Sequence, residues 1–301
     1  GVAIVSTIEN DTVFQDIFVL YNSSVELAMN ASLRVVSIDG CHLNHQRKDL
    51  RIIMLEGITA NNTIFPICFM VCFQENIRTL TKFFVMIQTK APKFWKWLDH
   101  GATTLLGDRG PGSCLVGVVD DCFELKAKGI LRSCVEHILN GLKRQRLGAY
   151  EVEYVRALAV CETEAEVEKM LLVIKADNTA LHSYIVHKSD YKFWVLAYVP
   201  YWKSDFYKVR SNMIEQEFKR LKTLAIREQD ILGICLHVTN LVSTLVNEFI
   251  FMCMDEQNKG NKLTPFASAL HSRERLGASS FRVRNYNKYQ PHARYALEHV
   301  G

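Results

Sequence analysis

The sequence predicts a mixed α/β fold, in which helices pack on a sheet of antiparallel and parallel strands. Between residues 33 and 73, the runs LRVVSID, LRIIMLEGIT and TIFPICFMVCF are separated by polar turns, which is typical of an antiparallel meander of three strands. Downstream, short apolar runs alternate with segments of helical spacing. The resulting order, β-β-β-α-β-α-β-α, favours a mixed sheet with helices packed on its faces.

The elements after the meander follow from their local patterns. Residues 75–88 have helical spacing, and ATTLLGD at 102–108 is a short apolar strand that ends at a charged turn. A helix begins near Gly112, a further strand covers 129–134, and a helix with the basic end KRQR covers 135–145. The second half of the chain has little strand signal, so we expect it to be largely helical.

These assignments divide the chain into five segments. We expect an N-terminal helical lead-in at 1–32, the first part of a core at 33–148, a helical insertion at 149–207, core helices at 208–256 and a basic tail at 257–301. The tail interleaves Arg and Lys with Phe and Tyr. It therefore either grips a DNA backbone and stacks on bases, or forms a mobile, disordered extension.

Composition narrows the class of protein. A hydrophobic content of 49% in 301 residues can fill a core, and a net charge of +4 suits nucleic acid without requiring it. The nine cysteines are scattered without a disulfide framework, so we expect free thiols in the cytosol or nucleus. Residues 231–254 are long and apolar enough to cross a bilayer, but they include His237 and Glu248, which favours a buried core helix and no membrane.

Two aspartates follow apolar strands. Asp39 ends VVSID, and Asp108 ends TLLGD. Strand-end acids in a mixed sheet can meet at one edge and share a hard cation such as Mg²⁺, and two such ions about 3.5–4 Å apart would support an in-line phosphoryl displacement. The alternative is that both are solubilising turn residues.

A third carboxylate is expected from the helix that begins near Ser211 or Asn212. Glu215 and Glu217 lie on either side of the apolar stripe of this helix, so periodicity does not choose between them. Either acid can instead complement the helix dipole in the first turn.

Two other features have both a functional and a structural interpretation. Cys134 and His137 form a candidate structural pair, C-V-E-H, but a zinc site needs four ligands, so zinc is not expected. His137 can instead stand near the acids as a proton carrier or phosphate contact, or pack in the core. Five basic residues near the Glu215 helix either contact phosphates or form a solvated face: Lys208, Arg210, Lys219, Arg220 and Lys222.

Taken in order, these signals resemble the Mutator-like element transposases, which are DDE enzymes with a ribonuclease H-like core. The resemblance covers about residues 14 to 250. The matching motifs are D-G-x-x-L at 39–43, an acidic residue at Glu75, D-R at Asp108 and Arg109, C-x-x-H at Cys134 and His137, a tryptophan at Trp194, and N-x-x-E at 212–215. This last motif selects Glu215 over Glu217. Pro111 stands where the family often has lysine, and the tryptophan usual after Glu75 is missing.

The resemblance implies a ribonuclease H-like (retroviral integrase-like) mixed sheet with flanking helices and a helical insertion before the last acid. Asp39, Asp108 and Glu215 would hold two Mg²⁺ or Mn²⁺ ions, with His137 helping to order the catalytic site. Arg109 would contact DNA. Trp194 would stack on an extruded base, although a flanking apolar sequence equally suits a core aromatic.

The resemblance implies a nuclear DNA transposase. It would cleave double-stranded DNA at terminal inverted repeats and join the freed 3′-hydroxyl to target DNA, acting as a homo-oligomer. The alternative is a domesticated, catalytically silent relative that binds DNA as a transcriptional regulator. The zinc modules that flank the core in many relatives are not found in these residues.

Overall fold

A computed structural model of the chain describes residues 2–9, 13–43, 50–59, 61, 63–107, 114–124, 131–133, 135–144, 149–198, 231–260, 281–285 and 296–299. The chain divides into two compact units. The first comprises Gly1–Thr59 and Ile64–Val246, and the second comprises Ala60–Thr63 and Asn247–Gly301.

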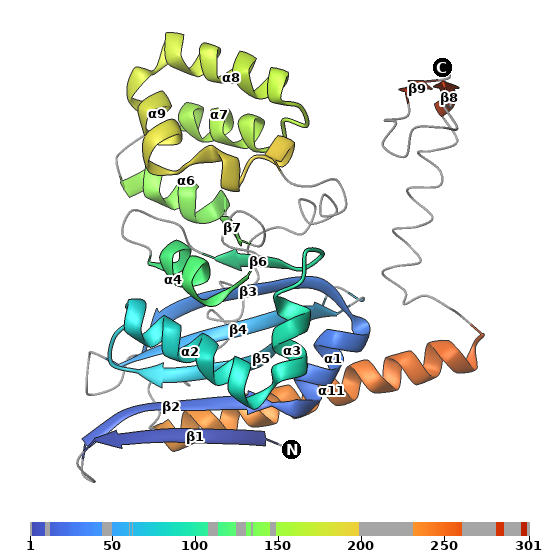
Figure 1. The fold of residues 1–301 in the computed structure, drawn as a ribbon. Helices are drawn as coiled ribbons and strands as arrows, with labels where there is room; N and C mark the ends of the chain where they lie inside the picture. Colours follow the sequence, from blue (N-terminus) through green and yellow to red (C-terminus); the bar gives the residue numbers. More distant parts are fainter. Residues whose placement is uncertain are drawn as a thin grey trace. The chain divides into compact units, whose positions relative to one another are not determined.

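The first unit is built on a mixed sheet, with the described strands in the order β1-β2-β5-β4-β3-β6-β7 (Figure 1). Their bounds are β1 Val2–Glu9, β2 Val13–Tyr21, β3 Ser32–His42, β4 Arg51–Thr59, β5 Ile64–Cys72, β6 Thr104–Gly107 and β7 Leu131–Ser133. The strands β3, β4 and β5 form an antiparallel meander, while β6 pairs parallel with both β3 and β7. The predicted meander, the mixed sheet and the α/β class are confirmed.

The predicted helical lead-in at 1–32 is wrong for most of its length. Residues 2–9 and 13–21 form the antiparallel hairpin β1–β2, and β2 pairs with β5. Only α1 (Asn22–Ala31) is helical. The reason is that VAIVSTIE and VFQDIFVLY are rich in β-branched and aromatic residues, which favour strands when an open sheet edge is available to pair with.

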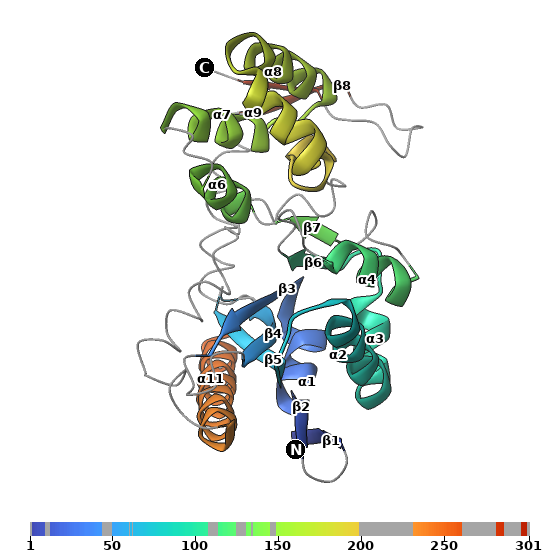
Figure 2. The ribbon, with the colours of Figure 1, turned by 90° about the vertical axis from the view of Figure 1, so that its left-hand side faces the viewer.

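Four helices lie on one face of the sheet (Figure 2): α1, α2 (Ile77–Lys90), α3 (Pro92–Leu98) and α4 (Leu115–Cys122). The helix α2 begins at Asn76, whose side chain accepts a hydrogen bond from the Thr79 backbone N–H at 3.0 Å. It buries Leu80, Phe83, Phe84 and Ile87, which share one helical face. The aromatic rings continue the core, since the centroids of Phe84 and Phe123 lie 5.0 Å apart, edge to face.

The helix α11 comprises Ile231–Asn258, and its residues up to Val246 belong to this unit. This part of α11 covers some of the opposite face of the sheet (Figure 2). The Tyr21 hydroxyl lies 3.1 Å from the Thr239 hydroxyl. Ile234, Val238 and Val242 are buried at four-residue spacing, so one face of this helix is buried in the unit. Among the described residues, the segment Gly233–Asn258 is the one helix whose length and composition would also let it cross a membrane.

The predicted helical insertion is confirmed as far as residue 198. It contains α7 (Ala149–Ala159), α8 (Glu164–Asp177), α9 (Thr179–Ser183) and the short turns η1 (Tyr184–Lys188), η2 (Tyr191–Phe193) and η3 (Leu196–Tyr198). Together with α6 (Val135–Arg144), these helices bury their own apolar core, which includes Leu142, Val155, Leu158, Ile174 and Leu181. Residues 199–207 lie outside the described residues.

In the second unit, β8 (Phe281–Asn285) and β9 (Ala296–His299) pair antiparallel. The eight cysteines that the structure describes are all free, as expected for them.

Candidate functional site

The candidate site lies where the parallel strands of the sheet end. Gly107, the last residue of β6, pairs with Ile38 of β3 on one side and with Ser133 of β7 on the other. Asp39 therefore stands one residue beyond the end of the β3–β6 ladder, while β3 continues to His42 along β4. In open α/β sheets, the carboxyl ends of parallel strands are the usual place for a ligand site.

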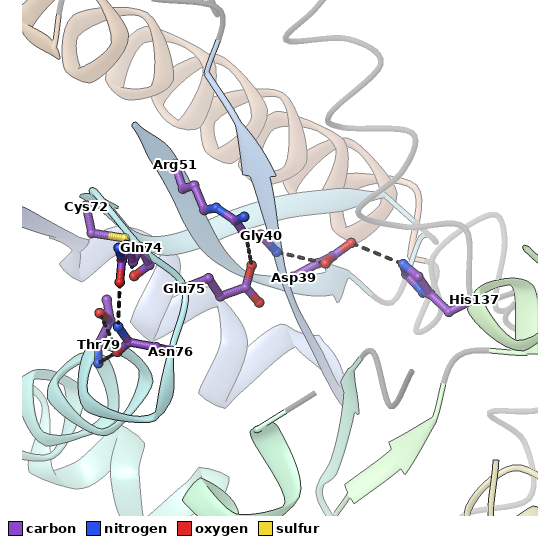
Figure 3. A network of polar contacts seen from close by, with 9 residues as sticks. All are labelled: Asp39, Gly40, Arg51, Cys72, Gln74, Glu75, Asn76, Thr79 and His137. Atoms are coloured by element: carbon purple, nitrogen blue, oxygen red, sulfur yellow. Dashed lines mark hydrogen bonds and ion pairs between the residues drawn. The ribbon is translucent and has the colours of Figure 1, made fainter. Parts of the chain in front are cut away.

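Asp39 is held from two directions (Figure 3). Its Oδ1 accepts a hydrogen bond from the Gly40 backbone N–H at 2.8 Å, and its Oδ2 lies 3.7 Å from Nε2 of His137. The side chains of Asp39 and His137 are only 16% and 24% exposed. At 3.7 Å the contact is electrostatic rather than a short hydrogen bond, and it is attractive when the imidazole is protonated.

The position of His137 follows from the local sequence. The helix α6 begins at Val135, directly after the short strand β7, so His137 falls in its first turn beside the strand ends. Ile138, Leu139 and Leu142 turn into the helical core and fix the rotation of α6. His137 is left at the rim of that core, facing Asp39.

A second polar group approaches β3 from the other side, near Gly40. Arg51 of β4 lies opposite Cys72 of β5, and its Nη1 is 3.3 Å from Oε2 of Glu75. The Glu75 carboxylate lies so close to Gly40 that a Cβ on that residue would be 2.8 Å from Glu75 Cδ. Gly40 is therefore required for this close approach, not for an unusual backbone conformation.

The two polar groups belong to opposite faces of the sheet. By register, Arg51 faces the same way as Asp16, whose carboxylate binds Lys82 of α2 at 2.6 Å. Asp39 is the partner of Met54, which is the partner of Phe69, and Phe69 packs against Tyr21 on the α11 side. In Figure 3, Glu75 reaches the strand at Gly40 from one side, and Asp39 points toward His137 on the other.

Two further buried residues with titratable side chains share the face of Asp39. Ser37 pairs with Glu56, which is fully buried, and also with Leu106, which in turn pairs with Arg132 of β7. Burial lowers the pKa of the Arg132 guanidinium. Sheet interiors are normally apolar, so such polar side chains on the face of Asp39 are typical of a functional site.

The sequence did not lead us to predict a role for Glu56 or Arg132, or the pairing of Arg51 with Glu75. An isolated acid within the apolar run LRIIMLEGIT was a signal for Glu56. The glycine directly after Asp39 was a signal for the close approach of another group.

The Cys72 thiol lies close enough to Glu75 and Asp16 to feel their charges. Its burial, followed by the charges of Glu75 and Asp16, raises the pKa of the thiol to about 12. The thiol is protonated at neutral pH, so Cys72 is not an activated nucleophile.

The structure places only three of the predicted site residues. It brings Asp39 and His137 together. Trp194 is 1% exposed and belongs to the buried cluster of the helical segment, which favours the core interpretation over stacking on an extruded base. The other predicted site residues lie outside the described residues: Asp108, Arg109, Cys134, Lys208, Arg210, Glu215, Lys219, Arg220 and Lys222.

Of the three expected metal ligands, Asp39 is the one that lies within the described residues. The Asp39 carboxylate offers hard oxygen donors of the kind that Mg²⁺ and Mn²⁺ prefer, and its Oδ1 is oriented by the Gly40 N–H. Within the described ranges, no three His, Cys, Asp or Glu side chains cluster closely enough to hold an ion by themselves. The Asp39 carboxylate therefore suits the role of one ligand in a metal site built from carboxylates.

No protein-family model matches this chain and no curated protein is significantly similar to it, so its functional assignment depends on the geometry around Asp39.

Proposed function

We propose that this chain is the catalytic core of a DDE-type DNA transposase with a ribonuclease H-like fold. The arrangement of the strands supports the fold assignment. The five strands β5-β4-β3-β6-β7 combine an antiparallel meander with two strands that run parallel to its first member. Helices on both faces and a helical segment after α6 fit the same architecture.

The observation that carries the proposal is the register of β3 and β6. Ile38, directly before Asp39, pairs with Gly107, which directly precedes Asp108 in the sequence. This register supports a shared cation for the two aspartates, because Asp39 and Asp108 each directly follow the last pair of the ladder between two neighbouring parallel strands. The contact of His137 with Asp39 supports a functional role for both side chains.

In this proposal, Asp39, Asp108 and Glu215 hold Mg²⁺ or Mn²⁺. The ions, when bound, activate the attacking oxygen and neutralise charge on the leaving oxygen. Asp39 contributes an oriented carboxylate, and His137 restrains its Oδ2 from the first turn of α6. The buried Glu56 and Arg132 give this part of the sheet a polar interior.

The reaction has two steps. In the first, a water oxygen forms a bond to the phosphorus at the element end and gives up a proton to solvent, while the bond from phosphorus to the 3′ oxygen breaks and that oxygen takes up a proton to become a hydroxyl. In the second, the freed 3′-hydroxyl oxygen loses its proton, forms a bond to a target phosphorus and displaces the 3′ oxygen of the target strand, which takes up a proton. The substrate is double-stranded DNA, and the proposal includes a homo-oligomer located in the nucleus.

The test is nicking of supercoiled plasmid DNA by the full chain with Mg²⁺ or Mn²⁺, measured beside DNA binding. Asp39→Asn keeps the size of the side chain and removes its charge, and we expect nicking to fall at least about 100-fold, since even the residues that orient metal ligands cost up to that much. The matched control is Asp121→Asn, an exposed aspartate on α4.

The outcomes separate the candidate functions. Nicking that is lost in Asp39→Asn and kept in Asp121→Asn supports the transposase. DNA binding without nicking by the unaltered chain favours the silent, regulatory relative. Equal nicking by the unaltered chain and Asp39→Asn overturns the role of Asp39.

A further inference from the structure

We infer that Glu75, held by Arg51, is a positioning residue for Asp39; the inference rests on the proposed function. Glu75 lies in the connection between β5 and α2, and its carboxylate packs against Gly40. Gly40 in turn donates its backbone N–H to Asp39 Oδ1 at 2.8 Å. One peptide unit of β3 therefore has Glu75 against one side and the Asp39 carboxylate bonded to its N–H (Figure 3).

The last residues of β3, beyond Ile38, are the part of the strand that contact with Glu75 would stabilise. Up to Ile38, the strand is bonded to β4 on one edge and to β6 on the other. Beyond Ile38, the described ladder with β6 has ended and only the β4 ladder continues. A strand end bonded on one edge can twist, and a twist at Gly40 would turn the N–H that orients Asp39. Glu75 opposes this movement by contact.

Arg51 fixes Glu75 in turn. Its Nη1 lies 3.3 Å from Glu75 Oε2, and its backbone pairs with His42 two residues past Gly40. The two side chains are 33% and 30% exposed. An ion pair so accessible to water contributes little to the free energy of unfolding. The ion pair matters because it holds the Glu75 carboxylate in place against Gly40. We therefore expect that breaking it changes metal affinity far more than the free energy of unfolding.

The first experiment tests the close approach by thermal unfolding, and it does not depend on function. Gly40→Ala adds a Cβ where the Glu75 carboxylate lies, so the Glu75 side chain must shift, and we expect the midpoint to fall by roughly 2–4 °C, the change that about 1 kcal/mol produces. In the Glu75→Ala background the space is free, and Gly40→Ala should cost less than half as much. An equal cost in both backgrounds overturns the contact and the inference with it.

The second experiment tests positioning by Mn²⁺ binding, followed by electron paramagnetic resonance on the full chain without DNA. We expect Glu75→Gln to weaken Mn²⁺ binding about 10-fold or more. Asp16→Asn is the control, because the Asp16–Lys82 pair is an ion pair on the same face of the sheet, but Asp16 lies on β2, which is separated from β3 by β5 and β4. It should leave Mn²⁺ affinity within about twofold, below the range expected for groups that orient metal ligands.

Arg51→Met separates positioning from direct ligation. A positioning role requires Arg51, so this variant should weaken Mn²⁺ binding as Glu75→Gln does. If Glu75 were itself a ligand, removing the competing cation would leave binding unchanged or tighten it, and the inference would be overturned.

Asp39→Asn distinguishes this failure from failure of the proposed function. If Asp39→Asn binds Mn²⁺ as well as the unaltered chain does, the carboxylate-metal function fails. If Asp39→Asn loses binding while Glu75→Gln and Arg51→Met keep it, the function stands and only the positioning role falls.

Discussion

Nε2 of His137 lies 3.7 Å from Oδ2 of Asp39, so the first turn of α6 contacts a carboxylate of β3 just beyond the β3–β6 ladder. The contact joins the helical insertion to the sheet at the point where β6 stops. It makes the orientation of Asp39 depend on the packing of α6, which Ile138, Leu139 and Leu142 anchor in the helical core.

The first prediction concerns this pair. His137→Gln keeps a polar side chain but removes the imidazole, and we expect metal-dependent plasmid nicking to fall about 10–100-fold, the usual effect of losing a group that orients a metal ligand. In the Asp39→Asn background, the same change should have no further effect, because the two side chains act together. His187→Gln, on an exposed histidine, is the control. If the losses of nicking caused by His137→Gln and by Asp39→Asn multiplied in the double variant, the two side chains would act independently and the coupling would be contradicted.

The second prediction concerns Trp194. Because it is 1% exposed in the helical core, we expect Trp194→Ala to lower the free energy of unfolding by about 3–5 kcal/mol. Trp194→Phe should retain most of the stability and leave DNA affinity unchanged, measured by fluorescence anisotropy well below the unfolding midpoint. Leu172→Ala, on an exposed leucine of α8, should change stability by about 0.5 kcal/mol or less. A stable Trp194→Phe protein with weakened DNA binding would restore the stacking role.

The third prediction concerns Gly107 at the end of β6. A Cβ on Gly107 would collide with Cδ2 of Leu115 in α4, so Gly107→Ala should lower the free energy of unfolding by about 1–3 kcal/mol. Leu115→Ala removes the colliding atoms and should reduce the additional cost of Gly107→Ala in a double-mutant cycle followed by urea unfolding.

Gly117, in α4, provides the matched control for Gly107. An added Cβ there meets no atom within 4 Å, so Gly117→Ala should stabilise the protein by about 0.5–1 kcal/mol through helix propensity. Equal destabilisation at both positions would show that collision with Leu115 is not the cause.

The fourth prediction concerns the pH dependence of α8. The backbone N–H groups of Glu162 and Thr163 donate to the Glu166 carboxylate at 2.9 and 3.1 Å, and these bonds lower the pKa of Glu166. With the folded pKa below the unfolded value of about 4.3, the contribution to stability is present above that value and is lost as pH falls through the folded pKa.

Glu166→Gln should therefore lower the midpoint of thermal unfolding at about pH 7, and the difference from the unaltered chain should shrink at about pH 3. Circular dichroism at both pH values measures it. Glu168→Gln, on the same helix, serves as the control. A difference that is the same at both pH values would refute the role of the Glu166 charge.

Several features could be predicted because neighbours in the sequence determine them. The alternation of apolar strands and polar turns between residues 33 and 73 predicted the meander, and helical spacing predicted α2 and α11. The N-terminal segment was mistaken for helix because its strands become favourable only when β2 pairs with β5. Local propensity is weak until an open sheet edge supplies the hydrogen bonds.

By itself, the sequence determined the α/β class, the helices at 149–198 and the apolar strand that contains Asp39, because each depends on residues a few positions apart. It placed the end of this strand at Asp39, whereas β3 continues to His42 through its pairing with β4. Only the tertiary structure decided that His137 contacts Asp39, that Glu75 and Arg51 meet beside Gly40, and that Trp194 is enclosed. These relations depend on strand register and helix rotation, which are fixed by packing between segments distant in the chain. No local pattern of residues encodes such distances.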